Sequence, residues 1–237
     1  MPASGSDSRR LGKGPVFKVA ATRYTGAVFY ILGLLARSGH GKTTVARHLE
    51  AGFGAEIRSL AGPMKRAVRN VFDFTEAQLW GTQAEKETVD PRYGFSPRWL
   101  LQRLGTEGLR REFGEDIHLQ ALVRGLRGEQ SVRPTGSPPG LYIVDDVRFP
   151  NDARFIAEGG ADFCGGLLKI VATDVPASEH ESHPSERFID AVRGADIAAT
   201  VVSSRAQGVA HLLAEVDRTL ATAPGFVGLL GTLARPI

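Results

Sequence analysis

The chain has 237 residues, of which 42% are hydrophobic and 23% are charged, so we expect a soluble globular protein with a substantial core. Its 29 Lys and Arg against 26 Asp and Glu give a net charge of only +3, which does not by itself argue for DNA binding. The single cysteine, Cys164, excludes a disulfide within the chain and suits a reducing compartment; we expect an incidental thiol there, not a nucleophile. The longest apolar run, residues 27–36, has about half the length that a membrane-spanning helix needs.

Composition divides the chain into three parts. Residues 1–26 are rich in Ser, Gly, Arg and Lys and show little periodicity, so we expect a flexible basic N-terminal extension. Residues 27–220 have the patterned hydrophobicity of one α/β domain. Residues 221–237 form a Gly-rich, apolar C-terminal tail, to which the sequence assigns no role.

Within the central domain, apolar runs that predict strands alternate with periodic segments that predict helices. This alternation implies a mostly parallel, five-stranded sheet with helices on both faces, a three-layer α/β/α architecture. In chain order we expect a strand over 27–36, a helix over 43–54, a strand over 55–61, helices over 63–72, 75–81 and 96–104, a loop over 128–140, a strand over 141–149, a helix over 151–160, strands over 166–172 and 198–204, and a helix over 206–220.

Local signals mark several helix starts. Pro63 stands where proline is favoured, in a first helical turn. Thr75 and Gln78 have the spacing of a capping box. Ser96 followed by Pro97 repeats the combination of an N-cap residue and a proline at the first helical position. In the first helix, an apolar face is formed by Val45, Ala46 and Leu49.

Between the first strand and the first helix lies "ARSGHGKT", residues 36–43, a near match to the phosphate-loop (P-loop) pattern G-x-x-x-x-G-K-[ST]. In this pattern backbone N–H groups curl around phosphate oxygens, the lysine reaches the outer phosphates and the hydroxyl binds Mg²⁺. Ala36 replaces the first glycine, a small steric change where the strand ends. We therefore predict an ATP or GTP site that includes Arg37, Ser38, Gly39, His40, Gly41, Lys42, Thr43 and Thr44.

Further charged residues follow the predicted strands, at the sheet edge where ligands of open α/β sheets bind. Lys65 begins a helix after the second strand, and Arg98 precedes Gln102 by one helical turn. A cationic pocket of this kind is what a kinase needs for a phosphorylated substrate.

The third long strand ends in Asp145 and Asp146, followed by Arg148. Carboxylates at a strand end are suitable ligands for Mg²⁺ or for its bound waters. We favour Asp146 for this role, with Asp145 as the alternative, and an ordinary strand-end turn remains open.

The ordered set "ARSGHGKTT", "SLAGPMK", "SPRWLLQRLGTE", "YIVDDVRFPNDARFIAEGGA" and "HPSE" resembles the deoxynucleoside monophosphate kinases of tailed bacteriophages and their bacterial relatives, over roughly residues 29–220. The resemblance implies a P-loop NTPase fold like that of adenylate kinase, often dimeric. It also implies transfer of the γ-phosphate of ATP to a deoxynucleoside 5′-monophosphate, with Mg²⁺, in the cytoplasm.

Matching motifs carry the family's functional residues onto this chain. Gly39, Gly41, Lys42, Thr43 and Thr44 would hold ATP and Mg²⁺, with Thr43 and Asp146 as metal ligands. Asp146 and Arg148 would lie between the two substrates and act with Lys42 in catalysis. The monophosphate pocket would be lined by Lys65, Arg98, Gln102, Gly105, Thr106, Arg148 and Glu186.

One departure concerns His118, where family members often carry a tryptophan. An imidazole would then replace the ring that stacks on the base, or His118 is simply a partly exposed helix residue. Two other functions stay open: a kinase that acts on a modified base or on a nucleotide within DNA, and a non-catalytic ATP-binding module. The first would bind DNA with strong salt dependence. A non-catalytic ATP-binding module would not need further cations besides Lys42, so the presence of Lys65, Arg98 and Arg148 argues against it.

Overall fold

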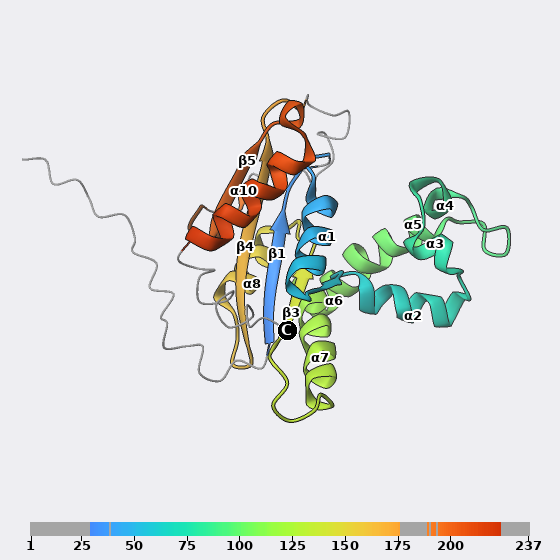
Figure 1. The fold of residues 1–237 in the computed structure, drawn as a ribbon. Coiled ribbons are helices and arrows are strands. Elements are labelled where there is room, and N and C mark those ends of the chain that lie inside the picture. The colour runs from blue at the N-terminus through green and yellow to red at the C-terminus, as the bar shows by residue number, and fades with distance from the viewer. Residues whose placement is uncertain (1–28, 38, 176–188, 190, 193, 224–237) are drawn as a thin grey trace, which may run out of the picture.

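Five strands, all parallel, form the centre of the molecule in the order β2–β3–β1–β4–β5 (Figure 1). This computed structural model describes residues 29–37, 39–175, 189, 191–192 and 194–223. The expected five-stranded sheet is confirmed, and it is wholly parallel. The strands are β1 (Phe29–Leu35), β2 (Glu56–Arg58), β3 (Gly140–Val144), β4 (Phe163–Ala172) and β5 (Ala199–Ser203).

Helices cover both faces of the sheet, which explains why all seven residues of β1 are buried and apolar or glycine. On one face, α1 (Lys42–Phe53) and α10 (Gly208–Thr222) pack against the strands. On the other, α7 (Ile117–Ser131) and α8 (Pro150–Glu158) do so. The predicted α/β/α layers are therefore present, and the apolar face of α1 is the predicted one, Val45, Ala46 and Leu49.

Between β2 and β3 the chain forms a helical arm that extends to one side of the sheet (Figure 1). It is built from α2 (Gly62–Phe72), α3 (Glu76–Trp80), α4 (Gln83–Glu87) and α5 (Pro97–Gln102), which continues into a π-helix, η2 (Arg103–Arg110), and α6 (Arg111–Phe113). The arm has a small core of its own, formed by Met64, Val68, Phe74 and Leu79. The predicted caps Thr75 and Ser96 both accept the expected backbone hydrogen bonds.

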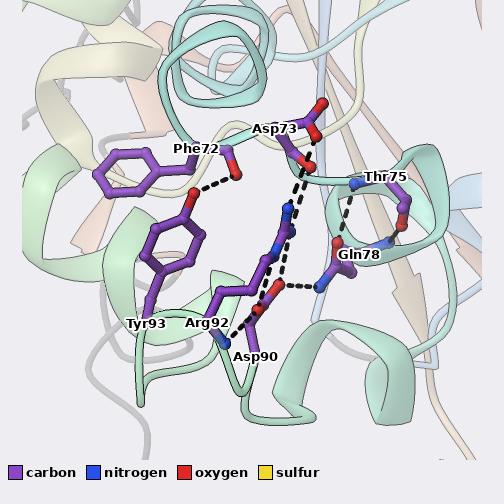
Figure 2. Close-up of polar contacts among 7 residues, drawn as sticks. All are labelled: Phe72, Asp73, Thr75, Gln78, Asp90, Arg92 and Tyr93. Atoms are coloured by element: carbon purple, nitrogen blue, oxygen red, sulfur yellow. Dashed lines mark hydrogen bonds and ion pairs between the residues drawn. The ribbon is translucent and has the colours of Figure 1, made fainter.

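A buried carboxylate braces the arm. Asp90 accepts hydrogen bonds from Arg92 Nε and Nη2 and from Gln78 Nε2, at 2.8–3.0 Å (Figure 2). The Arg92 side chain is the main reason why the pKa of Asp90 lies well below its usual range, and Gln78 adds to the effect. Because Gln78 also closes the capping box of α3 with Thr75, the network fixes α3 to the loop that precedes α5.

One predicted loop needs correction, and the predictions for the two terminal segments stay open. The loop predicted over 128–140 is wrong in its first residues, because α7 runs to Ser131 and ends three residues before Pro134. Glycines within this helix lower its intrinsic helix propensity. Packing against the sheet stabilises it by more than they cost, through the buried side chains of Leu119, Leu122, Val123 and Leu126. The predicted extension and nearly all of the C-terminal tail lie outside the described residues. None of the helices in the described ranges is long and apolar enough to cross a membrane.

Two glycines allow α8 to lie close to the sheet, which sets the position of the residues at its N-terminus. A methyl group on Gly33 of β1 would lie 3.2 Å from Ile156 Cδ1 of α8. One on Gly165 of β4 would lie 1.8 Å from the backbone oxygen of Ile156 in α8. The second contact involves backbone, so it cannot be relieved by a side-chain rotation.

We predict that Gly165→Ala lowers the free energy of unfolding by about 3 kcal/mol, because the helix must move away from the sheet. Gly128→Ala is the matched control: Gly128 lies in α7 with nothing within 4 Å of the added methyl group. This change should raise stability by about 0.5–1 kcal/mol through helix propensity. Urea unfolding of both variants checks the pair, and equal effects would contradict the close approach.

Candidate active site

The phosphate loop has the backbone conformation that its glycines predict. Gly39 and Gly41 have φ values of 79° and 89°, in the left-handed region that disfavours side chains. A methyl group on Gly41 would also lie 2.7 Å from Leu212 Cδ2. The loop leads directly into α1 at Lys42, so that the first N–H groups of a 12-residue helix point at the loop.

Ala36 does not disturb this loop. Its side chain is 2% exposed and packs in the core beneath the sheet edge, outside the left-handed region that would require glycine. His40 fastens the loop to the sheet, because its Nδ1 accepts a hydrogen bond of 3.0 Å from the backbone N–H of Ala172, at the end of β4. Ser38 lies outside the described residues.

A residue that the sequence did not single out, Arg205, also contacts the loop. It lies in η5 (Arg205–Gln207), directly after β5, and its Nη2 donates a hydrogen bond of 2.7 Å to the backbone oxygen of Gly39. Asp174 holds this turn by accepting hydrogen bonds from Ser204 Oγ and from the N–H groups of Arg205 and Ala206. These bonds, that of Ser204 foremost, lower the pKa of Asp174 to about 2.

At the end of β3, Asp146 binds to the neighbouring turn. Its carboxylate accepts hydrogen bonds from Ser59 Oγ at 2.6 Å and from the N–H groups of Leu60 at 2.8 Å and Ala61 at 3.4 Å. Both oxygens are engaged, so Asp146 joins the end of β3 to the start of α2. The predicted role of Asp146 as a metal ligand stays a prediction.

Asp145, the alternative ligand, is differently placed. Burial raises the pKa of its carboxyl, the neighbouring Asp146 raises it further, and Lys42 of the phosphate loop opposes both effects. Apart from its own backbone N–H, no described residue donates a hydrogen bond to this carboxylate. A half-buried carboxylate that interacts with the loop lysine is suited to a Mg²⁺ ion, so Asp145 stays the alternative ligand. Among the described residues no three His, Cys, Asp or Glu side chains gather that could hold a metal ion.

A cavity of about 900 Å³ opens between this strand end and the helical arm. It brings together residues from β2, α2, α5, the π-helix and the turn after β3. The predicted residues that line it are Lys65, Arg98, Gln102, Gly105, Thr106, Asp146 and Arg148, and Asp145 joins them. The phosphate loop adjoins the cavity through the charge interaction between Lys42 and Asp145. Glu186, also predicted here, lies outside the described residues.

Lys65 of the cavity lies beside an aromatic ring of the arm. Its Nζ lies 5.6 Å from the centre of the Trp80 ring, within the range of a cation–π interaction. Burial lowers the pKa of Lys65, and the positive charge of Lys86 on α4 lowers it further. Two lysines that repel each other across a cavity would be stabilised by an anion between them. Sequence reasoning missed Lys86 and Trp80, since neither follows a strand.

His118 is buried, with 8% of its surface exposed, so the expectation of a partly exposed helix residue is wrong. It lies on α7 as expected, and its Nε2 lies 3.2 Å from the carbonyl oxygen of Gly105 in the π-helix. Burial lowers its pKa. The imidazole therefore supports the π-helix from below and lines the floor of the cavity.

Comparison with known proteins identifies the family. No family model matches the chain. A protein of Acanthamoeba polyphaga mimivirus described as "Putative deoxynucleotide monophosphate kinase" is 34% identical over 172 residues, 70% of this chain and 86% of the viral protein. The chain belongs to the deoxynucleotide monophosphate kinases.

Two further similarities are weaker. The deoxynucleoside-5′-monophosphate kinase of Escherichia phage T5 is 34% identical to this kinase over 97 residues, which cover 40% of the chain and 36% of the phage protein. The crystal structure of TT1252 from Thermus thermophilus has a TM-score of 0.46 and 16% identity, over 80% of this chain and 95% of that one. The latter similarity is too low to add to the fold described above.

The two adjacent aspartates of this kinase should respond differently to neutralisation. We predict that Asp145→Asn lowers turnover about 10²-fold, because a charge that would act on Mg²⁺ is lost. Its Tm should stay the same or rise: the raised pKa means that the folded state disfavours the ionised carboxyl, a cost that asparagine removes. Asp146→Asn should instead lower the free energy of unfolding by about 1–3 kcal/mol, because an amide N–H₂ faces donors. Steady-state kinetics and thermal unfolding of both variants check this, and the reverse pattern would contradict it.

Arg205 should serve the donor nucleotide alone. We predict that Arg205→Ala raises KM for ATP about tenfold and leaves KM for the acceptor unchanged, because a charge-assisted bond to the phosphate loop is lost. Arg218→Ala is the control, an exposed arginine on α10 that pairs with Glu215. An unaltered KM for ATP in Arg205→Ala would show that the contact has no part in nucleotide binding.

Proposed function

We propose that this kinase transfers the γ-phosphate of ATP to the 5′-phosphate of a deoxynucleoside monophosphate, with Mg²⁺, and releases ADP and the diphosphate. The carrying observation is that Asp145, which lines the cavity together with Lys65, interacts electrostatically both with Lys65 and with Lys42 of the phosphate loop. One site is a phosphate loop and the other a cavity of nucleotide size. The names of the two viral relatives support the same acceptor class.

In this proposal the donor is held by the loop. Backbone N–H groups from Gly39 to Thr44 surround its β- and γ-phosphates, and Lys42 neutralises charge on the group in transfer. Thr43 and Asp145 would hold the Mg²⁺, which would supply positive charge to the phosphates. Arg37 and His40 shape the loop, the latter through its bond to β4.

The acceptor is held in the cavity, with its phosphate toward the loop. Lys65 and Lys86 bind the monophosphate, and Arg148 lies at the strand end between the two substrates. An oxygen of the acceptor phosphate attacks the γ-phosphorus in line, and the bond from that phosphorus to the β–γ bridging oxygen breaks. The remaining lining residues, Arg98, Gln102, Gly105 and Thr106, enclose the nucleoside. Glu186 stays a predicted contributor from outside the described residues.

The wider setting is also part of the proposal. The relative from Escherichia phage T5 supports a phage origin for the chain. The family resemblance alone supports work in the host cytoplasm and a homodimer. Free nucleotides are the proposed substrates, and no nucleic-acid or membrane partner is proposed.

The test is ADP release from ATP and Mg²⁺, with dAMP, dGMP, dCMP, dTMP and dUMP offered one at a time. The proposal predicts release that depends on one or more of them, with the matching diphosphate formed in equal amount. ATP binding without any such stimulation would contradict it. That result would move the function to a DNA-acting kinase or a non-catalytic module, which salt-dependent DNA binding would separate.

Lys42→Ala provides a direct check of the phosphate loop. We predict a loss in turnover of at least about 10²-fold, because charge next to the transferring group is removed. The thermal unfolding midpoint should stay close to that of the unaltered chain, since Lys42 is only half-buried. A near-normal rate with the monophosphate would contradict the placement of ATP.

A further inference from the structure

Asp174 joins the turn after β4 to the turn after β5. Its Oδ1 accepts a hydrogen bond of 2.7 Å from the backbone N–H of Arg205. Its Oδ2 accepts one of 2.7 Å from Ser204 Oγ and one of 2.9 Å from the backbone N–H of Ala206. The residue before Asp174 adds a backbone hydrogen bond of 2.9 Å to the last carbonyl oxygen of β5. The turn after β4 therefore holds the backbone from which the Arg205 side chain extends.

The Arg205 side chain reaches the phosphate loop from this turn. Its Nη2 donates a hydrogen bond of 2.7 Å to the backbone oxygen of Gly39. A methyl group on Gly39 would lie 2.8 Å from the same nitrogen and 3.9 Å from Val175 Cγ1, in the turn after β4. The guanidinium and this turn are thus both packed against the loop at one glycine. A positive charge lies beside the loop that binds the donor phosphates in the proposed function.

A second contact between β4 and the loop lies two residues before Asp174. The backbone N–H of Ala172, the last residue of β4, donates a hydrogen bond of 3.0 Å to His40 Nδ1. Gly39 and His40 are adjacent in the chain, so the peptide between them is held at two points. One contact is direct, through the His40 ring, and the other runs through Arg205. Both begin at the carboxyl end of β4.

The contact between Arg205 and the loop depends on how well its backbone is fixed. Arg205 is exposed, and ordering its long side chain on one carbonyl costs conformational entropy comparable to the gain from the hydrogen bond. The cost falls where the backbone at the base of the side chain is already ordered. Asp174 provides this order. Its hydrogen bonds, that of Ser204 foremost, lower its pKa to about 2, so the carboxylate is ionised at neutral pH.

We propose that Asp174 is a positioning residue for the donor nucleotide, which acts through Arg205 to hold the phosphate loop in its binding conformation. The carboxylate sets where the guanidinium lies, and the guanidinium holds the loop. A loop that is already ordered binds phosphate at a lower cost in conformational entropy. The effect is confined to ATP, because residues of other elements line the acceptor cavity. The inference rests on the proposed function in one point, that the loop binds ATP.

The experiment measures the affinity of the full chain for ATP and Mg²⁺ by titration calorimetry, without an acceptor. The variants are Asp174→Ala, Arg205→Ala and the chain that carries both changes. Each single change should weaken ATP binding about tenfold, the usual effect of losing a charge-assisted hydrogen bond. The double variant should bind ATP no more weakly than Arg205→Ala alone, because Asp174 then has no side chain left to position.

Steady-state kinetics and two further variants complete the design. In Asp174→Ala, KM for ATP should rise about tenfold, while KM for the monophosphate and kcat at saturating ATP stay unchanged. Asp174→Asn keeps one oxygen as an acceptor, so it should weaken ATP binding by a smaller factor. It replaces Asp174→Ala where that variant lacks the circular dichroism of the folded enzyme. Asp217→Ala is the matched control: this exposed carboxylate on α10 pairs with His48 on α1, and its loss should leave ATP affinity unchanged.

The outcomes separate the inference from the function on which it rests. Unchanged ATP affinity in Asp174→Ala overturns the positioning role. Losses that multiply in the double variant overturn it as well, since Asp174 and Arg205 would then act independently. So does an equal rise in KM for both substrates together with a lower Tm, the pattern of a residue that only supports the fold. A chain that binds ATP and phosphorylates no monophosphate would remove the proposed acceptor without affecting the ATP titrations, and a chain that binds no ATP would remove both.

Discussion

The site depends on the carboxylate of Asp146, which acts through its hydrogen bonds to a neighbouring turn. Asp146 ends the strand next to β1 and binds Ser59, Leu60 and Ala61 across the turn that starts α2. This contact ties the sheet, which carries the phosphate loop, to the arm, which carries Lys65. Because Asp145 precedes it in the chain, fixing Asp146 on the turn also fixes Asp145 beside Lys42. In the proposed function, this connection would set the distance between donor and acceptor, on which in-line transfer depends.

The electrostatics of the cavity favour a ligand that is anionic at one end and neutral at the other. Lys65 and Lys86 repel each other, and burial adds to the cost of charging Lys65. At the other end, Arg110 and Asp152 form a pair with little net charge. A nucleoside monophosphate has this same division, with a phosphate dianion joined to an uncharged base. Binding of a monophosphate would therefore relieve the repulsion between the lysines.

Sequence reasoning succeeded where local chemistry decides structure. The phosphate loop, the caps at Thr75 and Ser96 and the buried strand β1 all depend on signals within a few residues, and all are present. It could not assign different roles to Asp145 and Asp146, because both aspartates stand at the end of the same strand. They differ in the hydrogen bonds that Asp146 accepts from a turn far away in the sequence.

Tertiary contacts explain what the sequence did not predict. Lys86 and Arg110 come from helices in the middle of the chain and line the cavity because the arm and the strand ends both contribute to its walls. Arg205 follows β5 in the same way as Lys65 follows β2. The rule that ligands bind at the carboxyl ends of parallel strands, which pointed to Lys65, could therefore have pointed to Arg205 as well. The full length of α7 depends on burial against the sheet, which no local signal reveals.

The central claim is that donor and acceptor lie end to end along one edge of the sheet. Titration calorimetry with a bisubstrate compound, adenosine joined to a deoxynucleoside through five phosphates, tests it most directly. The account predicts one molecule bound per chain, about 10²-fold or more tighter than ATP, because the second half binds at high effective concentration. It also predicts that Lys42→Ala and Lys65→Ala each weaken this binding. An affinity no greater than that of ATP, insensitive to Lys65→Ala, would contradict the placement of the two nucleotides.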